Sequence, residues 1–218
     1  MLVDIREYVG QKEVEIEVVG LRRACRVDQV EPELWIVGND HLCYGCDVEF
    51  TKKAAKKMAV RLRAFRPEYI LTAAAKSLAL AYELAKILEC EGVAVARKSI
   101  SPTPPRLIRT PIKSITSQKD EEIMIDGETA DKIRGKRVVV FDDTISLGRT
   151  MGGLKRLALA SGAKLVALAA IWVEGVAPFV VFKKEYSRGE LVYLAVFPMF
   201  ARGKTYQAIL AERRLIER

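Results

Sequence analysis

Residues 137–150 constrain the fold of this chain more than any other stretch; they read RVVVFDDTISLGRT. The apolar run at the start is typical of a strand buried on both faces of a parallel sheet. Two aspartates, a loop of hydroxyls and glycine, and a helical pattern follow. The backbone N–H groups and helix dipole of such a unit favour an anion, and the carboxylates favour hydroxyls or a metal ion. We therefore predict a site for a sugar phosphate rather than a plain strand–helix turn, because paired buried carboxylates are costly without a ligand.

Strands and helices alternate from residue 51 to residue 173, which indicates βαβ crossovers and a parallel sheet. Helices are expected at 52–65, after Thr51 as N-cap, at 78–88 and at 151–161, and strands at 69–72, 92–97 and 163–173. Before them, strands are expected at 13–19, 22–30 and 34–37; after them, a strand at 191–196 and a helix at 206–216. We expect an α/β fold with an open, mostly parallel sheet and helices on both faces.

Residues 98–136 break this alternation. The segment contains SPTPPR, then many Lys, Ser, Thr and Gln residues, and it has little helical periodicity. A connection of this length inside a compact domain is usually functional, so we predict a flexible lid loop in preference to a plain mobile surface loop. A β-hairpin of residues 115–117 and 122–125 is expected at its tip.

The bulk properties narrow the class of protein. The 218 residues suit one α/β domain, and no apolar run approaches the roughly 20 residues of a membrane span. Without a signal-peptide pattern, a cytoplasmic protein is the expectation. The net charge of +8 is compatible with nucleic acid or a polyphosphate ligand, but the basic residues are scattered, so charge alone does not select nucleic acid. Scarce Asn and Gln with plentiful Lys, Arg and Glu fit a thermophile.

Cys43 and Cys46 form a CYGC motif just after His41, the only histidine. Cys25 and Cys90 do not complete a zinc site at the usual spacing, and the motif lacks the strand–helix context of a thioredoxin-like redox pair. Two interpretations stay open: a turn with two half-buried thiols, or a disulfide of a thermophile. His41 is expected on the surface.

Ligands of an open parallel sheet collect at the carboxyl ends of its strands. Three predicted strand ends carry unusual residues, namely small residues with a lysine at 74–77, the cations Arg97 and Lys98, and the acidic loop at 142–150. Two cationic ends, a phosphate cradle and an acidic pair together point to a ligand with phosphates at two ends.

Residues 138–150 resemble the phosphoribosyl pyrophosphate (PRPP) signature of type I phosphoribosyltransferases, and the resemblance extends over about residues 50–175. It implies that Asp142 and Asp143 contact the ribose hydroxyls, help to hold Mg²⁺–PRPP and stabilise positive charge on the sugar. It implies a 5′-phosphate cradle of Thr144, Ser146, Leu147, Gly148, Arg149 and Thr150. Pyrophosphate would meet Ala74, Ala75, Lys76, Arg97 and Lys98. The lid would act through Lys113, Lys119, Glu121 or Glu122, the two glutamates being candidate catalytic residues.

The chain also departs from the family pattern. Leu147 and Arg149 replace the usual Thr and Gly, and Ser146 stands where hypoxanthine-guanine enzymes carry an aspartate. With Arg97-Lys98 and paired glutamates in a long lid, these departures favour the adenine and xanthine branch. In the domain scheme that the resemblance implies, residues 49–175 bind PRPP, and residues 1–48 together with 176–218 form a hood over the base. Five residues are either border residues of the base pocket or plain core: Trp172, Glu174, Phe179, Phe197 and Phe200.

The resemblance favours an Mg²⁺-dependent enzyme of purine salvage that transfers the phosphoribosyl group of PRPP to a purine, most readily adenine, and releases pyrophosphate. A PRPP-sensing transcription regulator is the alternative from another class, but the first fifty residues predict strands instead of a DNA-binding helical module. An orotate enzyme is a third option, which the long lid with paired glutamates disfavours. A homodimer is expected because the family is commonly dimeric, and neither a membrane nor nucleic acid is expected as a partner.

Overall fold

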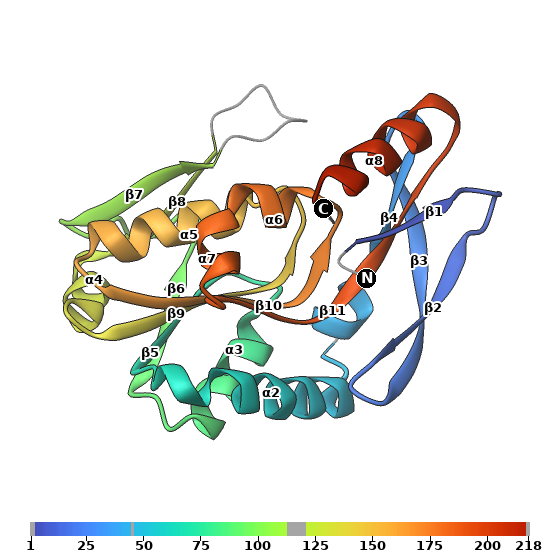
Figure 1. Ribbon diagram of the computed structural model, residues 1–218. Helices are drawn as coiled ribbons and strands as arrows, with labels where there is room; N and C mark the ends of the chain where they lie inside the picture. The colour runs from blue at the N-terminus through green and yellow to red at the C-terminus, as the bar shows by residue number, and fades with distance from the viewer. Residues whose placement is uncertain (1–2, 45, 113–120, 217–218) are drawn as a thin grey trace.

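The computed structural model describes residues 3–44, 46–112 and 121–216, and it confirms the predicted α/β fold (Figure 1). Five parallel strands form the core of the sheet, in the order β6, β5, β9, β10, β11. Their bounds are Gly92–Ala96 for β6, Tyr69–Ala73 for β5, Arg137–Ile145 for β9, Lys164–Glu174 for β10 and Leu191–Ala201 for β11. The apolar run at 138–141 thus lies in β9, the middle one of the five parallel strands, where it is buried as the sequence predicts.

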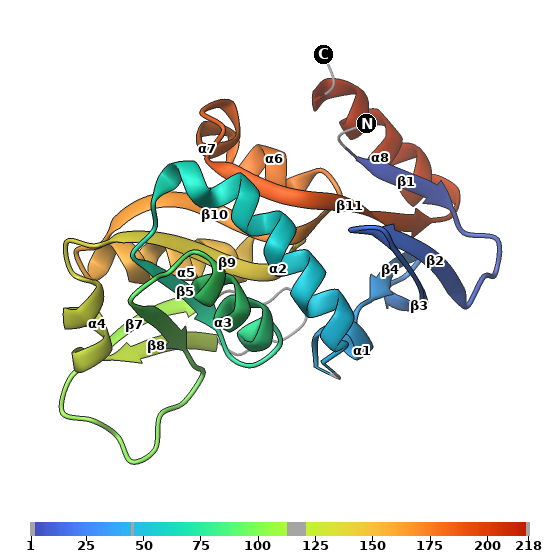
Figure 2. The same ribbon diagram turned by 90° about the horizontal axis from the view of Figure 1, so that it is seen from below.

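Helices cover both faces of the parallel strands. On one face lie α2 (Val48–Leu62) and α3 (Leu78–Ile87), which Figure 2 shows in front of the sheet; on the other lie α5 (Arg149–Ala160), α6 (Ala177–Val181) and α7 (Lys183–Ser187). Alternate residues of β9 pack into the apolar clusters on the two faces of the sheet, because successive side chains of a strand point to opposite faces. Val139 and Phe141 pack with α2 and α3, whereas Val138 and Val140 pack with α5.

The predicted N-cap of α2 was wrong. Asp47, not Thr51, caps this helix, and its carboxylate accepts a hydrogen bond from the Phe50 N–H at 2.9 Å. Both residue types are good caps. The helix starts earlier because Phe50 is fully buried and belongs to its apolar face.

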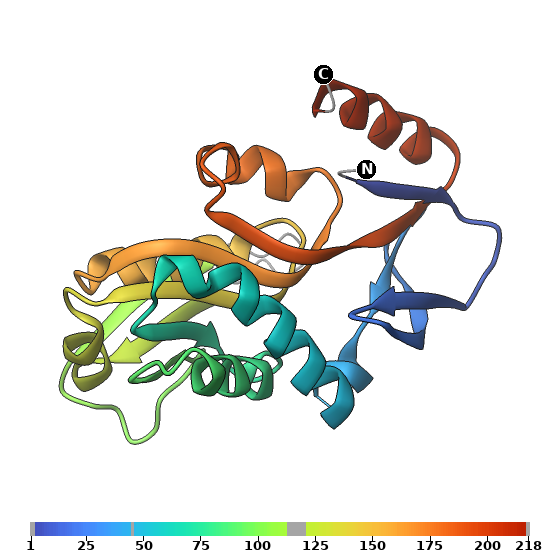
Figure 3. The same cartoon turned by 60° about the horizontal axis from the view of Figure 1, so that its bottom comes forward.

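Strand β11 links the parallel sheet to a second, smaller group of strands. Its residues up to Phe197 pair with β10, and Pro198–Ala201 pair in parallel with β1 (Asp4–Glu7). The same end pairs antiparallel with β4 (Leu34–Gly38), which continues to β3 (Leu21–Glu31) and β2 (Glu13–Val18). We call β1–β4 with α8 (Gly203–Ile216) the hood; Figure 3 shows it at one end of the core.

The segment at 98–136 is more ordered than predicted. It contains the hairpin β7 (Leu107–Ile112) and β8 (Glu121–Asp126), then a short helix, α4 (Gly127–Ile133). The second hairpin strand agrees with the prediction, but the first lies at 107–112; residues 115–117 fall outside the described residues, as do Lys113 and Lys119. Ile112 and Ile123 pack on α5 at Gly153, so the base of this segment is fixed by apolar burial. The movement of a lid stays a prediction.

No helix in the described ranges is long and apolar enough to cross a membrane.

Candidate functional site

A cavity of about 330 Å³ lies where the carboxyl ends of β5, β9 and β10 meet β4 and the short helix α1 (Asp40–Cys43) of the hood side. It is lined by Ile36, Val37, Asn39, Tyr44, Ala73, Ala74, Ala75, Lys76, Ser77, Asp142, Asp143, Thr144, Ser146, Thr150 and Glu174. The structure therefore brings together the predicted carboxylate pair, one predicted pyrophosphate end and part of the predicted phosphate cradle. This is the edge at which open α/β sheets bind ligands.

The aspartate pair at the end of β9 is buried. The Ser77 hydroxyl donates to Asp142 Oδ1 at 2.9 Å, and the Asp143 backbone N–H donates to the same oxygen at 3.0 Å. Burial, together with the adjacent charge of Asp143, raises the pKa of Asp142 well above its usual range. Two carboxyls in so confined a place are stabilised by any ligand that brings hydroxyls or positive charge.

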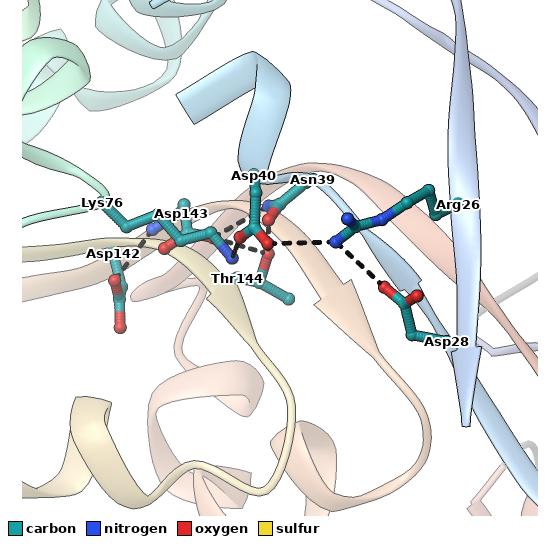
Figure 4. Close-up of polar contacts among 8 residues, drawn as sticks. All are labelled: Arg26, Asp28, Asn39, Asp40, Lys76, Asp142, Asp143 and Thr144. Carbon is teal, nitrogen blue, oxygen red and sulfur yellow. Dashed lines mark hydrogen bonds and ion pairs between the residues drawn. The ribbon is translucent and has the colours of Figure 1, made fainter. Parts of the chain in front are cut away.

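Asp143 is held by groups from three parts of the chain (Figure 4). Asn39 Nδ2 donates to Asp143 Oδ2 at 2.8 Å, Thr144 Oγ1 lies 3.2 Å from that oxygen, and Lys76 Nζ lies 3.8 Å from it. Lys76 also pairs with Asp40 at 2.8 Å. Burial alone would lower the pKa of Lys76, but the charges of Asp143 and Asp40 outweigh it and the net shift is upward. A half-buried ammonium group thus stands beside the carboxylates, as an anionic ligand would require.

The loop after Asp143 forms a second, smaller hollow of about 180 Å³, lined by residues 144–151. Gly148 adopts φ +73° at the N-cap of α5, and a Cβ there would come within 2.9 Å of the Phe182 ring. No side chain in the described part of the chain caps α5, so its first N–H groups are available to an anion. Arg149 and Thr150 begin this helix, and Leu147 is exposed.

The remaining predicted contacts divide into two groups. Ala74 and Ala75, joined by a cis peptide, line the cavity beside Lys76. Four others do not line it: Arg97, Lys98, Glu121 and Glu122. Lys98 instead pairs with Glu121 at 2.9 Å, and Glu122 lies 3.8 Å from Arg109 on the hairpin. A role for these four residues in the site stays a prediction.

Of the five residues proposed for the base pocket or the core, only Glu174 lines the cavity. Trp172 is stacked between Phe50 and Phe197, with ring centroids 5.3 and 4.3 Å away, and is core. Phe179 and Phe200 are also buried in the apolar clusters. Glu174 is 3% exposed, and its Oε1 has no hydrogen-bond partner among the described residues. Burial raises the pKa of Glu174 to about 7, although the Ser146 side chain and the Val37 backbone favour the charged form.

Sequence reasoning missed Asn39 and Asp40, and it included Ser77 in the strand end at 74–77 without giving it a role. Asn39 had one available signal, because it is the only asparagine in the chain, and the structure buries it to 2% exposure against Asp143. Asp40 and Ser77 had none, since their roles depend on contacts with Lys76 and Asp142 across the fold.

The CYGC motif lies beside the site on α1 and the residues after it. The four cysteines are free thiols, so the disulfide interpretation is wrong. Cys43 is buried and Cys46 is exposed, with Cys46 Sγ 3.7 Å from the Cys43 carbonyl oxygen. Burial, with the nearby Asp143 charge, raises the pKa of the Cys43 thiol. His41 is exposed, as predicted.

A parallel sheet whose strand ends place a carboxylate pair between a phosphate loop and a lysine defines a sugar-phosphate-binding protein. The family model described as "Phosphoribosyl transferase domain" matches residues 49–190. The chain belongs to the type I phosphoribosyltransferase family, and this membership implies PRPP and a base as ligands. Among curated proteins, none matches the sequence.

Solved structures support the fold. Adenine phosphoribosyltransferase from Thermoanaerobacter pseudethanolicus is 17% identical, with a TM-score of 0.62 over 79% of this chain and 95% of that one. The Trypanosoma brucei enzyme, solved with AMP, pyrophosphate and ribose-5-phosphate, is 20% identical, with a TM-score of 0.61 over 74% and 70% of the two chains. The Rhodothermus marinus enzyme is 18% identical, with a TM-score of 0.61 over 79% and 93%.

Replacing Glu174 by Gln is expected to stabilise the fold at alkaline pH. At pH 4.5 the carboxyl is protonated in the folded state and about half ionised in the unfolded state, so wild type and variant should differ little in stability. Above a folded-state pKa of about 7 the wild type must keep a buried charge, which costs about 3 kcal/mol of unfolding free energy. Chemical denaturation at pH 4.5 and pH 8 measures the difference. A variant that is less stable than wild type at pH 8 would contradict this expectation.

Proposed function

We propose that this protein is an Mg²⁺-dependent phosphoribosyltransferase that transfers the phosphoribosyl group of PRPP to adenine and releases pyrophosphate. One observation carries the proposal: the Asp142–Asp143 pair lines one cavity between Lys76 and the loop before α5. A ligand with a sugar in the middle and phosphates at both ends has the same order of groups. The proposal deepens the family assignment by naming the reaction and the base.

The residues of the cavity have distinct roles in this reaction. The N–H groups at the start of α5, with the Ser146 and Thr150 hydroxyls, would bind the 5′-phosphate. The carboxylates would accept hydrogen bonds from the ribose hydroxyls and stabilise the positive charge that develops on the sugar as pyrophosphate leaves. Lys76 would meet the pyrophosphate, since its ammonium already lies beside the carboxylates.

The aspartate pair fits a supporting role toward Mg²⁺. Carboxylate oxygens suit this ion, which usually keeps several waters and binds phosphates of the substrate. No group of three or more His, Cys, Asp or Glu side chains in the described ranges is arranged to hold a metal ion by itself. Asp142 and Asp143 would therefore hold it indirectly, through PRPP oxygens or water. When bound, the ion would neutralise charge on the departing pyrophosphate.

Adenine is favoured as the base by two features. Ser146 lines the cavity where hypoxanthine-guanine enzymes of the family carry an aspartate. The adenine phosphoribosyltransferases named above share the fold. The homodimer and the thermophilic source stay predictions.

Incubation with PRPP, Mg²⁺ and single bases, with pyrophosphate release as the readout, tests this function. We expect turnover with adenine, less with hypoxanthine, guanine and xanthine, and none with orotate; omission of Mg²⁺ should abolish it. Turnover with orotate alone would reassign the base. No turnover with any base, together with PRPP-dependent retention of DNA at physiological salt, would replace the enzyme by a regulator.

A further inference from the structure

Glu174 is a buried carboxyl that has no role in the reaction proposed above. It ends β10, is 3% exposed and lines the same cavity as the aspartate pair. Its Oε1 has no hydrogen-bond partner among the described residues. Buried polar atoms are nearly always paired, so an unpartnered carboxylate oxygen beside a ligand cavity indicates that the ligand supplies the partner.

The position of Glu174 shows which part of the ligand it would meet. Strand β10 pairs with β9 in parallel, with Trp172 opposite Thr144 and Val173 opposite Ile145. Glu174 therefore lies two residues beyond the level of Thr144, roughly 7 Å along the strand. The sugar is assigned to the aspartates just before Thr144, so Glu174 lies beyond the sugar, level with Ser146, whose side chain interacts with its carboxyl. Ser146 is the position at which hypoxanthine-guanine enzymes of the family carry an aspartate.

The neighbours of Glu174 suit a planar base. Ile36 and Val37 of β4 line the cavity on the hood side, and they offer apolar surface to the face of a ring. Binding sites commonly combine such apolar walls with a few polar groups that fix orientation. Glu174 is the acidic group of the lining outside the aspartate pair.

We propose that Glu174 is the specificity-determining residue for the base and accepts a hydrogen bond from its exocyclic amino group. This inference rests on the proposed function. The ionised carboxylate, which predominates above the Glu174 pKa of about 7, only accepts hydrogen bonds. It therefore matches the amino group of adenine and opposes the carbonyl oxygen of hypoxanthine at the same ring position, and the base preference is measured at pH 8. Sites built to hydrogen-bond one group reject an analogue without it, because buried polar atoms are then left unpaired.

The Glu174→Gln variant separates this role from a structural one. An amide can donate to a carbonyl, so we expect the ratio of kcat/KM for adenine to that for hypoxanthine to fall by about 10- to 100-fold. The KM for PRPP should change less than about threefold, because the sugar and phosphate contacts are untouched. Glu31→Gln, an exposed site on β3, is the matched control and should leave the ratio unchanged. Glu174→Asp, which keeps the carboxylate, should restore part of the preference.

The outcomes are distinguishable. If wild type uses adenine and Glu174→Gln keeps its base ratio within about twofold while remaining folded, the role of Glu174 is wrong and the proposed function stands. If Glu174→Gln does not fold, Glu174→Ala, which removes the carboxylate, takes its place, and an unchanged base ratio in that variant overturns the role. If wild type does not release pyrophosphate with any of the bases tested, the proposed function fails and the role of Glu174 fails with it.

Discussion

Asp143→Asn is expected to lower kcat/KM for pyrophosphate release by about 10²- to 10³-fold, the usual loss for one electrostatic contact to a transition state. The fold should survive, because the amide oxygen that the substitution introduces can still accept the hydrogen bond that Asn39 Nδ2 gives to Asp143 at 2.8 Å. The negative charge beside the sugar and beside Lys76 would be lost. Steady-state kinetics with PRPP and adenine, with circular dichroism as a check on folding, measure the effect.

Asp28→Asn is the matched control for that experiment. Asp28 is a half-exposed carboxylate of the hood that pairs with Arg26, and Arg26 also pairs with Asp40, the partner of Lys76 (Figure 4). The substitution therefore removes a negative charge outside the cavity, at the outer end of this row of ion pairs. Its kcat/KM should stay within about twofold of wild type, since surface ion pairs contribute little. If Asp143→Asn keeps the activity of this control, the reacting sugar is bound elsewhere.

The parallel core could be predicted from sequence because its signals are local. The apolar run of β9 ends in two aspartates, and a continuous apolar run of this length is typical of a parallel strand that is buried on both faces. The cradle loop could also be predicted, since its hydroxyls and glycine follow the two aspartates directly in the sequence and precede a helical pattern. Signals of this kind need no knowledge of what packs across the sheet.

The other half of the site could not be predicted because distant segments supply it. Asn39 reaches Asp143 across 104 residues of sequence, through a hood whose placement depends on how β11 extends past the core. Glu174 was predicted as either a border residue of the base pocket or plain core, and its position at the end of an apolar run could not decide between the two. The hairpin was misplaced for a related reason: its apolar face is defined by α5, which follows it in the chain.

Trp172→Ala is expected to lower the free energy of unfolding by about 3–5 kcal/mol, the usual cost of removing a large buried aromatic side chain. Trp172 is 0% exposed and lies between the rings of Phe50 on α2 and Phe197 on β11. The cavity left by the indole would therefore loosen the contact between a covering helix and two strands. Denaturant unfolding monitored by far-UV circular dichroism measures the loss.

Trp172→Phe, which keeps an aromatic ring between the two neighbours, should cost clearly less than Trp172→Ala. The indole Nε1 has no hydrogen-bond partner in the described part of the chain, so replacing the indole by a phenyl ring removes no hydrogen bond. At a temperature where both variants are folded, their preference for adenine over hypoxanthine should match that of wild type, because Trp172 does not line the cavity. A changed base preference at unchanged stability would instead place the indole in the base pocket. The opposite pattern is expected for Glu174→Gln, which should gain stability at pH 8 and lose base preference. Near the end of β10, Trp172 would thus act in the core and Glu174 in the binding site.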